Sequence, residues 1–134
     1  MYLSGMEDVF AGEEVAALKA QVLSAKSVVV TSHRSPDGDA IGSSLALKHM
    51  FSAMGVPCAV VMPDAYAKFL HWMPGHEEVR FHDAEPEAAS ALVSSAEVLF
   101  CLDYNAPSRA GGLMDAVNQA CANAKSSVVM IDHH

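Results

Sequence analysis

The chain alternates short apolar runs with segments in which apolar residues recur at helical spacing. Continuous runs rich in apolar residues cover residues 28–30, 57–62, 96–102 and 126–131. Such runs are typical of strands that are buried on both faces of a parallel sheet. A brief edge strand is expected at residues 79–81. The pattern predicts an α/β fold, in which a Rossmann-like parallel sheet is flanked by helices.

The segments between these runs predict the helices. Residues 63–86, which include Trp72 and three histidines, have poor periodicity, and we expect loop or surface roles for those histidines. Elsewhere the spacing of apolar residues predicts helices over residues 13–25, 40–54, 87–95 and 109–124, with a shorter one at residues 65–70.

The densest chemistry lies in the sequence SHRSPDGDAIGSSLAL, residues 32–47. His33, Asp37 and Asp39 follow an apolar strand, at the end where open α/β sheets bind ligands. One imidazole and two carboxylates on a tight loop suit a hard divalent cation. A purely structural alternative is that Asp37 forms a turn with the following glycine and Asp39 caps the helix.

Two later strands end in residues of the same types. Asp103 follows residues 96–102, and the chain ends with Asp132, His133 and His134. Because the carboxyl ends of parallel strands meet at one edge of a sheet, these side chains should converge with those of the first loop. The combined set fits a two-metal site, in which ions about 3.5–4 Å apart act on a phosphoryl group.

These segments resemble the DHH phosphoesterases, whose name is the Asp-His-His found here at residues 132–134. The similarity covers HRSPDGDAIGSSLAL, VLFCLDYN and IDHH, in the order of the family. It is greatest to the bacterial short-oligoribonuclease and phosphoadenosine-phosphate phosphatase branch, which is related to single-strand exonucleases. The resemblance implies a metal-dependent phosphoesterase that hydrolyses phosphodiester or phosphomonoester bonds of short oligoribonucleotides or 3′-phosphorylated nucleotides.

The resemblance also implies a set of metal ligands. His33, Asp37 and Asp103 would hold one ion, and Asp39, Asp103 and His133 the other, with Asp103 as the bridge. Two Mn2+ ions are expected, because a mixture of imidazole and carboxylate ligands suits Mn2+ better than Mg2+, which is the second choice.

Catalytic and substrate-binding roles follow from the same resemblance. His134 would face the phosphate, to stabilise charge or to protonate the leaving oxygen, and Asp132 would orient a histidine. Arg34, Ser43 and Asn105 are expected beside the substrate. Backbone N–H groups at the start of the helix that follows the first loop could also face a phosphate.

Composition narrows the partners and the compartment. The formal charge of −8 argues against a binder of long nucleic acids, so a short single-stranded RNA or a nucleotide is favoured. The basic residues are scattered and are expected to be solvated. No signal peptide and no long apolar run is found, which predicts a cytoplasmic protein without membrane association. The odd count of three cysteines predicts buried free thiols, with Cys101 a core residue rather than a nucleophile.

The last predicted strand runs directly into the Asp-His-His, and the sequence stops there. We expect residues 1–134 to be the N-terminal portion of a DHH phosphoesterase domain, without the rest of that domain and without a C-terminal substrate-binding domain. The function is therefore expected of the parent protein. An exopolyphosphatase or pyrophosphatase, a cyclic-dinucleotide phosphodiesterase and a non-catalytic metal- or nucleotide-binding regulatory module remain alternatives, and a homodimer stays open.

Overall fold

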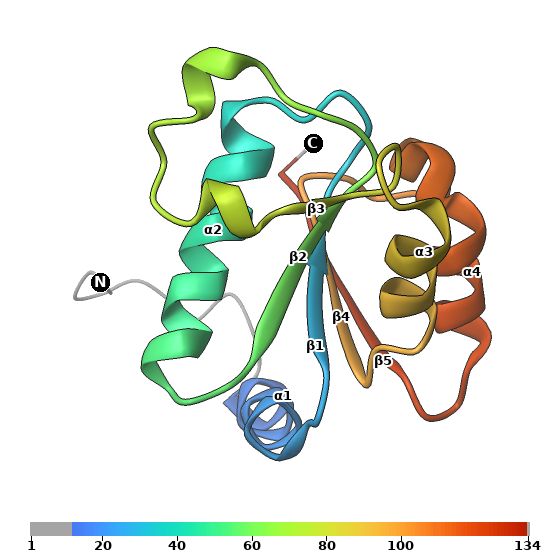
Figure 1. Cartoon of the computed structure of the whole chain (residues 1–134). Helices are drawn as coiled ribbons and strands as arrows, with labels where there is room; N and C mark the ends of the chain where they lie inside the picture. Colours follow the sequence, from blue (N-terminus) through green and yellow to red (C-terminus); the bar gives the residue numbers. More distant parts are fainter. Residues whose placement is uncertain (1–11, 134) are drawn as a thin grey trace.

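The computed structural model describes residues 12–133 and contains one five-stranded parallel sheet, in the order β3-β2-β1-β4-β5 (Figure 1). The predicted α/β fold class is confirmed. None of the described helices combines the length and the apolar character needed to cross a membrane. The strands are β1 (Val28–Thr31), β2 (Cys58–Met62), β3 (Arg80–Phe81), β4 (Val98–Leu102) and β5 (Ser127–Ile131). The helices are α1 (Gly12–Ser24), α2 (Gly38–Ala53), α3 (Pro86–Ser94) and α4 (Met114–Ala122), with 3-10 segments η1 (Lys68–Leu70), η2 (His76–Glu78) and η3 (Pro107–Leu113).

Each face of the sheet has its own apolar core, because side chains alternate between the faces along a strand. Val28 and Val30 of β1 pack in one cluster with Leu45 of α2. Val29 lies in the other cluster, together with Val117 of α4. Figure 1 shows α2 over one face of the sheet, and α3 and α4 over the other. The central strands are therefore covered on both sides, which explains their continuous apolar sequences.

The strand order places the first loop beside the fourth strand. From β1 the chain proceeds outward through β2 to β3, and it then returns to add β4 and β5 on the opposite side of β1. Thr31 pairs with Cys101, and Leu102 pairs with Ile131, so β1, β4 and β5 end at the same edge. Open α/β sheets bind ligands in the crevice at such a reversal of strand order.

Two helix predictions need correction. Residues 65–70 form only the short 3-10 segment η1, rather than a helix over the whole range. Residues 109–124 do not form one continuous helix, because Gly111, inside η3, adopts φ 56° and ψ −129°, and α4 begins only at Met114. This backbone conformation is readily accessible to glycine and ends the helical hydrogen-bonding pattern.

The cysteines only partly match the prediction of buried thiols. Cys101 is fully buried within β4 and Cys58 is half-buried, but Cys121 is exposed. Burial raises the pKa of the Cys58 and Cys101 thiols to about 11. A thiol with such a pKa is almost entirely protonated at neutral pH, so Cys101 is a core residue, as predicted.

Replacing Gly111 by alanine should destabilise the protein. A Cβ atom at this position would lie 3.2 Å from the Cβ atoms of both Arg34 and Pro63, and φ is +56°. A left-handed backbone conformation costs a non-glycine residue about 1–2 kcal/mol, so the free energy of unfolding should fall by at least that amount. Urea denaturation measures the change. Gly12→Ala is the matched control, because a Cβ there meets nothing within 4 Å, and an equal loss in both variants would contradict the argument.

Candidate metal centre

The loop between β1 and α2 is fixed to its surroundings at two points. The hydroxyl of Ser32 donates a hydrogen bond of 2.6 Å to the carbonyl of Leu102, which ties the end of β1 to the end of β4. The N–H of Ser35, a residue with φ 52°, donates to Oδ1 of Asp64 at 2.7 Å. His33 lies between these two anchors and is buried. The loop therefore presents the His33 ring in a defined position.

Asp37 and Asp39 lie at the start of α2, but Asp39 is not the residue that caps this helix. The helix begins at Gly38, and Oδ1 of Asp37 accepts a hydrogen bond of 2.9 Å from the N–H of Ala40. Asp37 is therefore the N-cap, and the interpretation in which Asp39 caps the helix is wrong. The N–H of Ile41 also bonds to the main chain of Asp37. The amides of Ala40 and Ile41 are thus engaged within the helix and do not face a phosphate.

Asp103 directly follows β4 and is 8% exposed. Its φ of 66° is uncommon for a residue with a side chain, although aspartate tolerates this region better than most. The N–H of Asp103 donates to the carbonyl of Ile131 at 2.9 Å. Its Oδ2 lies 3.3 Å from Nε2 of His33, and its Oδ1 lies 2.9 Å from Nε2 of His133. The carboxylate is therefore held between two histidines.

One oxygen of this carboxylate is not satisfied by hydrogen bonding. Oδ1 of Asp103 is buried and accepts no hydrogen bond within the described residues, so the approach of His133 has an ion-pair distance without hydrogen-bond alignment. A buried carboxylate oxygen without a donor is energetically unfavourable. A cation beside Oδ1 would remove that penalty.

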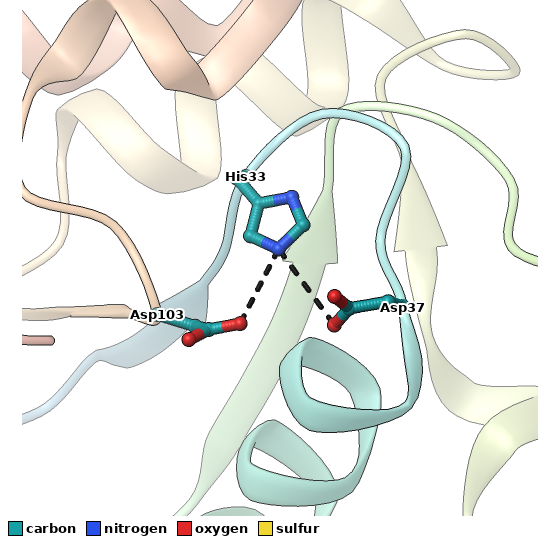
Figure 2. A group of neighbouring side chains, drawn as sticks. All are labelled: His33, Asp37 and Asp103. Atoms are coloured by element: carbon teal, nitrogen blue, oxygen red, sulfur yellow. Dashed lines mark ion pairs between the residues drawn. The ribbon is translucent and has the colours of Figure 1, made fainter. Parts of the chain in front are cut away.

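The orientation of the His33 ring also favours a cation. Its Nδ1 lies 2.7 Å from the carbonyl oxygen of Arg34. A carbonyl can only accept, so we assign the proton of the neutral ring to Nδ1. The lone pair then lies on Nε2, which faces Oδ2 of Asp103 at 3.3 Å and Oδ1 of Asp37 at 3.8 Å (Figure 2). A lone pair aimed at two carboxylates is repelled by them unless a proton or a metal ion lies between, and a backbone-anchored histidine is typical of metal ligands.

The described residues contain two groups that could hold a metal ion, and within each group the ligand atoms lie within 4.8 Å of one another. Asp103 belongs to both groups. These are the two ligand sets that the resemblance implies, so the structure brings all five residues together, while metal binding itself stays a prediction. The groups are His33, Asp37 and Asp103, and Asp39, Asp103 and His133.

A hollow of about 330 Å³ lies beside the second group. Two other residues predicted for the site, Ser43 and Asp132, line it. The hydroxyl of Ser43 also donates to the carbonyl of Asp39 at 2.6 Å. Asn105 is exposed and does not line the hollow. His134 lies outside the described residues, so its predicted role stays a prediction.

The backbones of two arginines are joined next to this site. The N–H of Arg34 donates to the carbonyl of Arg109 at 2.8 Å, and both residues are exposed. Within residues 12–133 neither guanidinium forms an ion pair, whereas Arg80 pairs with Glu85 at 3.1 Å. The expectation of scattered basic residues is therefore wrong for this pair. The proximity of Arg109 to Arg34 was not predicted, because no local pattern connects the two positions.

The fold and the site define an α/β protein whose strand ends present a candidate two-metal centre of histidines and aspartates. A model of the DHH family, N-terminal domain, matches residues 27–134. The chain belongs to the DHH family, which confirms the resemblance at the level of the family.

A solved structure supports the same conclusion. The crystal structure of an exopolyphosphatase-related protein from Bacteroides fragilis superposes with a TM-score of 0.86 and is 36% identical in sequence. The similarity covers 96% of this chain and 37% of that chain, so this chain spans little more than a third of that protein. No curated protein gave a match.

Removing the shared carboxylate should lower the metal content. Asp103→Ala in the full-length protein deprives both groups of a ligand and leaves the charges of two cations less well offset. We expect the number of bound Mn2+ ions to fall from two to one or none, measured by calorimetric titration and by metal analysis after dialysis. Asp115→Ala, which removes an exposed carboxylate at the start of α4, should bind Mn2+ like the wild type. Two tightly bound ions in Asp103→Ala would disprove the bridging role.

Proposed function

We propose that the protein carrying this chain is a metal-dependent phosphoesterase that hydrolyses phosphodiester or phosphomonoester bonds in short oligoribonucleotides or 3′-phosphorylated nucleotides. The observation that carries this proposal is the position of Asp103 between two groups of candidate ligands. Two-metal phosphoryl transfer requires ions about 3.5–4 Å apart that flank the attacking and leaving oxygens, and a shared carboxylate supports that spacing.

The donor set fits two divalent cations, with Mn2+ as the first choice and Mg2+ as the second. When bound, such ions supply electrostatic stabilisation of the phosphoryl oxygens and increase the acidity of a coordinated water. The residues of this chain supply the geometry. His33 is oriented by the carbonyl of Arg34, and Asp103 is fixed by the β4–β5 ladder. The buried ends of β1 and β4 exclude water from one side of the centre.

Other residues have proposed roles around this centre. His134 would stabilise the phosphoryl charge or protonate the leaving oxygen, and Asp132 would orient a histidine. Ser43 lines the hollow, where it could contact the substrate. Arg34 and Asn105 are proposed to bind parts of the substrate beyond the scissile bond. The guanidinium of Arg34 suits a second phosphate, because arginine matches the geometry of phosphate oxygens.

Charge favours a small substrate. The net charge of this chain is −8, which does not favour the binding of long nucleic acids. Local positive charge from Arg34 and Arg109, together with bound cations, would still attract one or two phosphates. Short oligoribonucleotides and nucleotides are small and carry only a few phosphates, so they fit both the overall charge and the local charge.

A second candidate function is hydrolysis of phosphoanhydride bonds in polyphosphate. The similarity to a protein described as exopolyphosphatase-related favours it. The same centre could act on either substrate, since both present a phosphoryl group to the same ligands. The two candidate substrates differ in what is attached to the phosphoryl group: a nucleotide carries a sugar and a base, and polyphosphate carries further phosphates.

Parallel assays of the full-length protein with Mn2+ test the proposal. Di- to pentaribonucleotides, phosphoadenosine phosphate, polyphosphate, pyrophosphate and cyclic dinucleotides are compared at equal concentrations. Release of mononucleotides from short RNA, or of phosphate from phosphoadenosine phosphate, is the expected result, and it should disappear with a chelator and return with Mn2+. A clear preference for polyphosphate would establish the second candidate. Binding of nucleotides without turnover would indicate a regulatory module.

Arg34→Gln should weaken substrate binding more than it slows the chemical step. Charge-assisted hydrogen bonds contribute about 1.5–3 kcal/mol, so KM for substrates with a second phosphate should rise at least about tenfold, while kcat stays within a few-fold. Steady-state kinetics measure both constants. Arg80→Gln is the matched control, because that guanidinium is engaged with Glu85. An equal effect in the two variants would argue against a phosphate contact at Arg34.

A further inference from the structure

Two aromatic side chains are unusually exposed. Phe69 is 76% exposed and Trp72 is 73% exposed, and they are the two most exposed large hydrophobic residues among those described. Trp72 is also the single tryptophan of the sequence. Phenylalanine and tryptophan are usually well buried, and exposed apolar groups that cluster together mark surfaces of interaction.

Phe69 lies in η1, and Trp72 lies two residues beyond the end of η1 at Leu70. The bonding pattern repeats every three residues, so side chains three residues apart align. Phe69 and Trp72 are spaced in this way. The N–H groups bond to carbonyls three residues earlier, from Leu70 to Ala67 at 3.0 Å, from His71 to Lys68 at 3.0 Å and from Met73 to Leu70 at 3.2 Å.

The other side of this turn lies against the first turns of α2. A Cβ atom on Gly38 would lie 4.0 Å from Cδ2 of Leu70, and one on Gly42 would lie 4.0 Å from Cε of Met73. These glycines stand on either side of Asp39 in the first turns of α2. Figure 1 shows the light-green turn at residues 68–70 next to the first turn of α2, at the edge of the sheet where β5 ends. The exposed rings are therefore carried by a segment that lies against the start of α2, the helix that carries Asp39.

Contacts within the segment keep this turn in place. The hydroxyl of Tyr66 donates to the carbonyl of His76 at 3.2 Å. The His71 ring meets the edge of Tyr66 at a centroid distance of 5.1 Å and stacks on His76 at 4.9 Å. Leu70 is buried in the core beneath α2. The backbone that carries Phe69 and Trp72 is thus held in place before any ligand arrives, which lowers the entropy lost on binding.

We propose that Phe69 and Trp72 form a stacking subsite for a nucleobase of a substrate whose phosphate lies at the candidate metal centre, an inference that rests on the proposed function. Every base has a π face, so stacking on exposed rings tolerates different sequences. Lys68, exposed in the same turn, adds a positive charge near the backbone of such a substrate. Polyphosphate has no ring to stack, so this subsite serves a nucleotide and not the second candidate substrate.

Kinetics of the full-length protein test the subsite. Base stacking on an aromatic side chain changes affinity about fivefold or more, so Trp72→Ala and Phe69→Ala should each raise KM for a diribonucleotide by at least that factor. The kcat value and the hydrolysis of pyrophosphate should stay within twofold of wild type. Trp72→Phe should restore most of the affinity. Leu23→Ala, at a side chain 52% exposed on α1, is the control for loss of a surface apolar group, and thermal unfolding verifies that each variant is folded.

Fluorescence gives a second readout that does not depend on turnover. The difference between wild type and Trp72→Phe isolates the emission of this indole, and adenosine monophosphate should quench it, whereas inorganic phosphate should not. Unchanged emission and unchanged KM, in a protein that still cleaves short RNA, would overturn the subsite and leave the proposed function intact. A change of oligomeric state in Trp72→Ala, or emission of a buried indole before ligand is added, would also overturn it by showing that protein covers the rings. Turnover of polyphosphate alone would instead refute the proposed function.

Discussion

The buried carboxylate of Asp103 is the constraint around which the candidate site is built. It lies between the Nε2 atoms of His33 and His133, at 3.3 and 2.9 Å, and its Oδ1 accepts no hydrogen bond within the described residues. A negative charge buried in this way is unfavourable unless cations offset it. The same residue adopts φ 66°, and its N–H is bonded to the end of β5. The backbone of the sheet edge and the candidate metal centre therefore meet at one residue.

The parallel sheet produces this convergence. β1 lies between β2 and β4, and the register brings the ends of β1, β4 and β5 to one edge. Helices on both faces bury β1 and β4, whereas the edge strand β5 is more exposed. The polar residues that follow these three strands emerge together into the crevice at the reversal of strand order. Two segments border the site, one with the exposed aromatic rings of Phe69 and Trp72 and one with the positive charge of Arg109. Leu70, beside the exposed rings, belongs to the core under α2, whereas Leu113 of η3, the segment that carries Arg109, belongs to the core under α4.

Much of the fold could be predicted from local patterns. Apolar runs identified the strands, because a strand covered on both faces has few polar positions, and helical periodicity identified the long helices. The failures occurred where packing between distant segments outweighs local preference. Residues 65–70 form a short turn whose Leu70 packs near Gly38, and the segment after β4 is divided at Gly111, next to Arg34 and Pro63.

The sequence by itself determined which residues follow the strands, and the resemblance it carries implied the two ligand sets that the structure brings together. Tertiary structure decided the rest. Either Asp37 or Asp39 satisfies the preference for aspartate at a helix start, and only the path of the loop from β1 selects Asp37 as the cap. The contact between Arg34 and Arg109 joins segments far apart in the sequence. The spacing of apolar residues predicts whether a residue is buried. Its neighbours from distant parts of the sequence are determined only when the sheet and its two helical layers pack together.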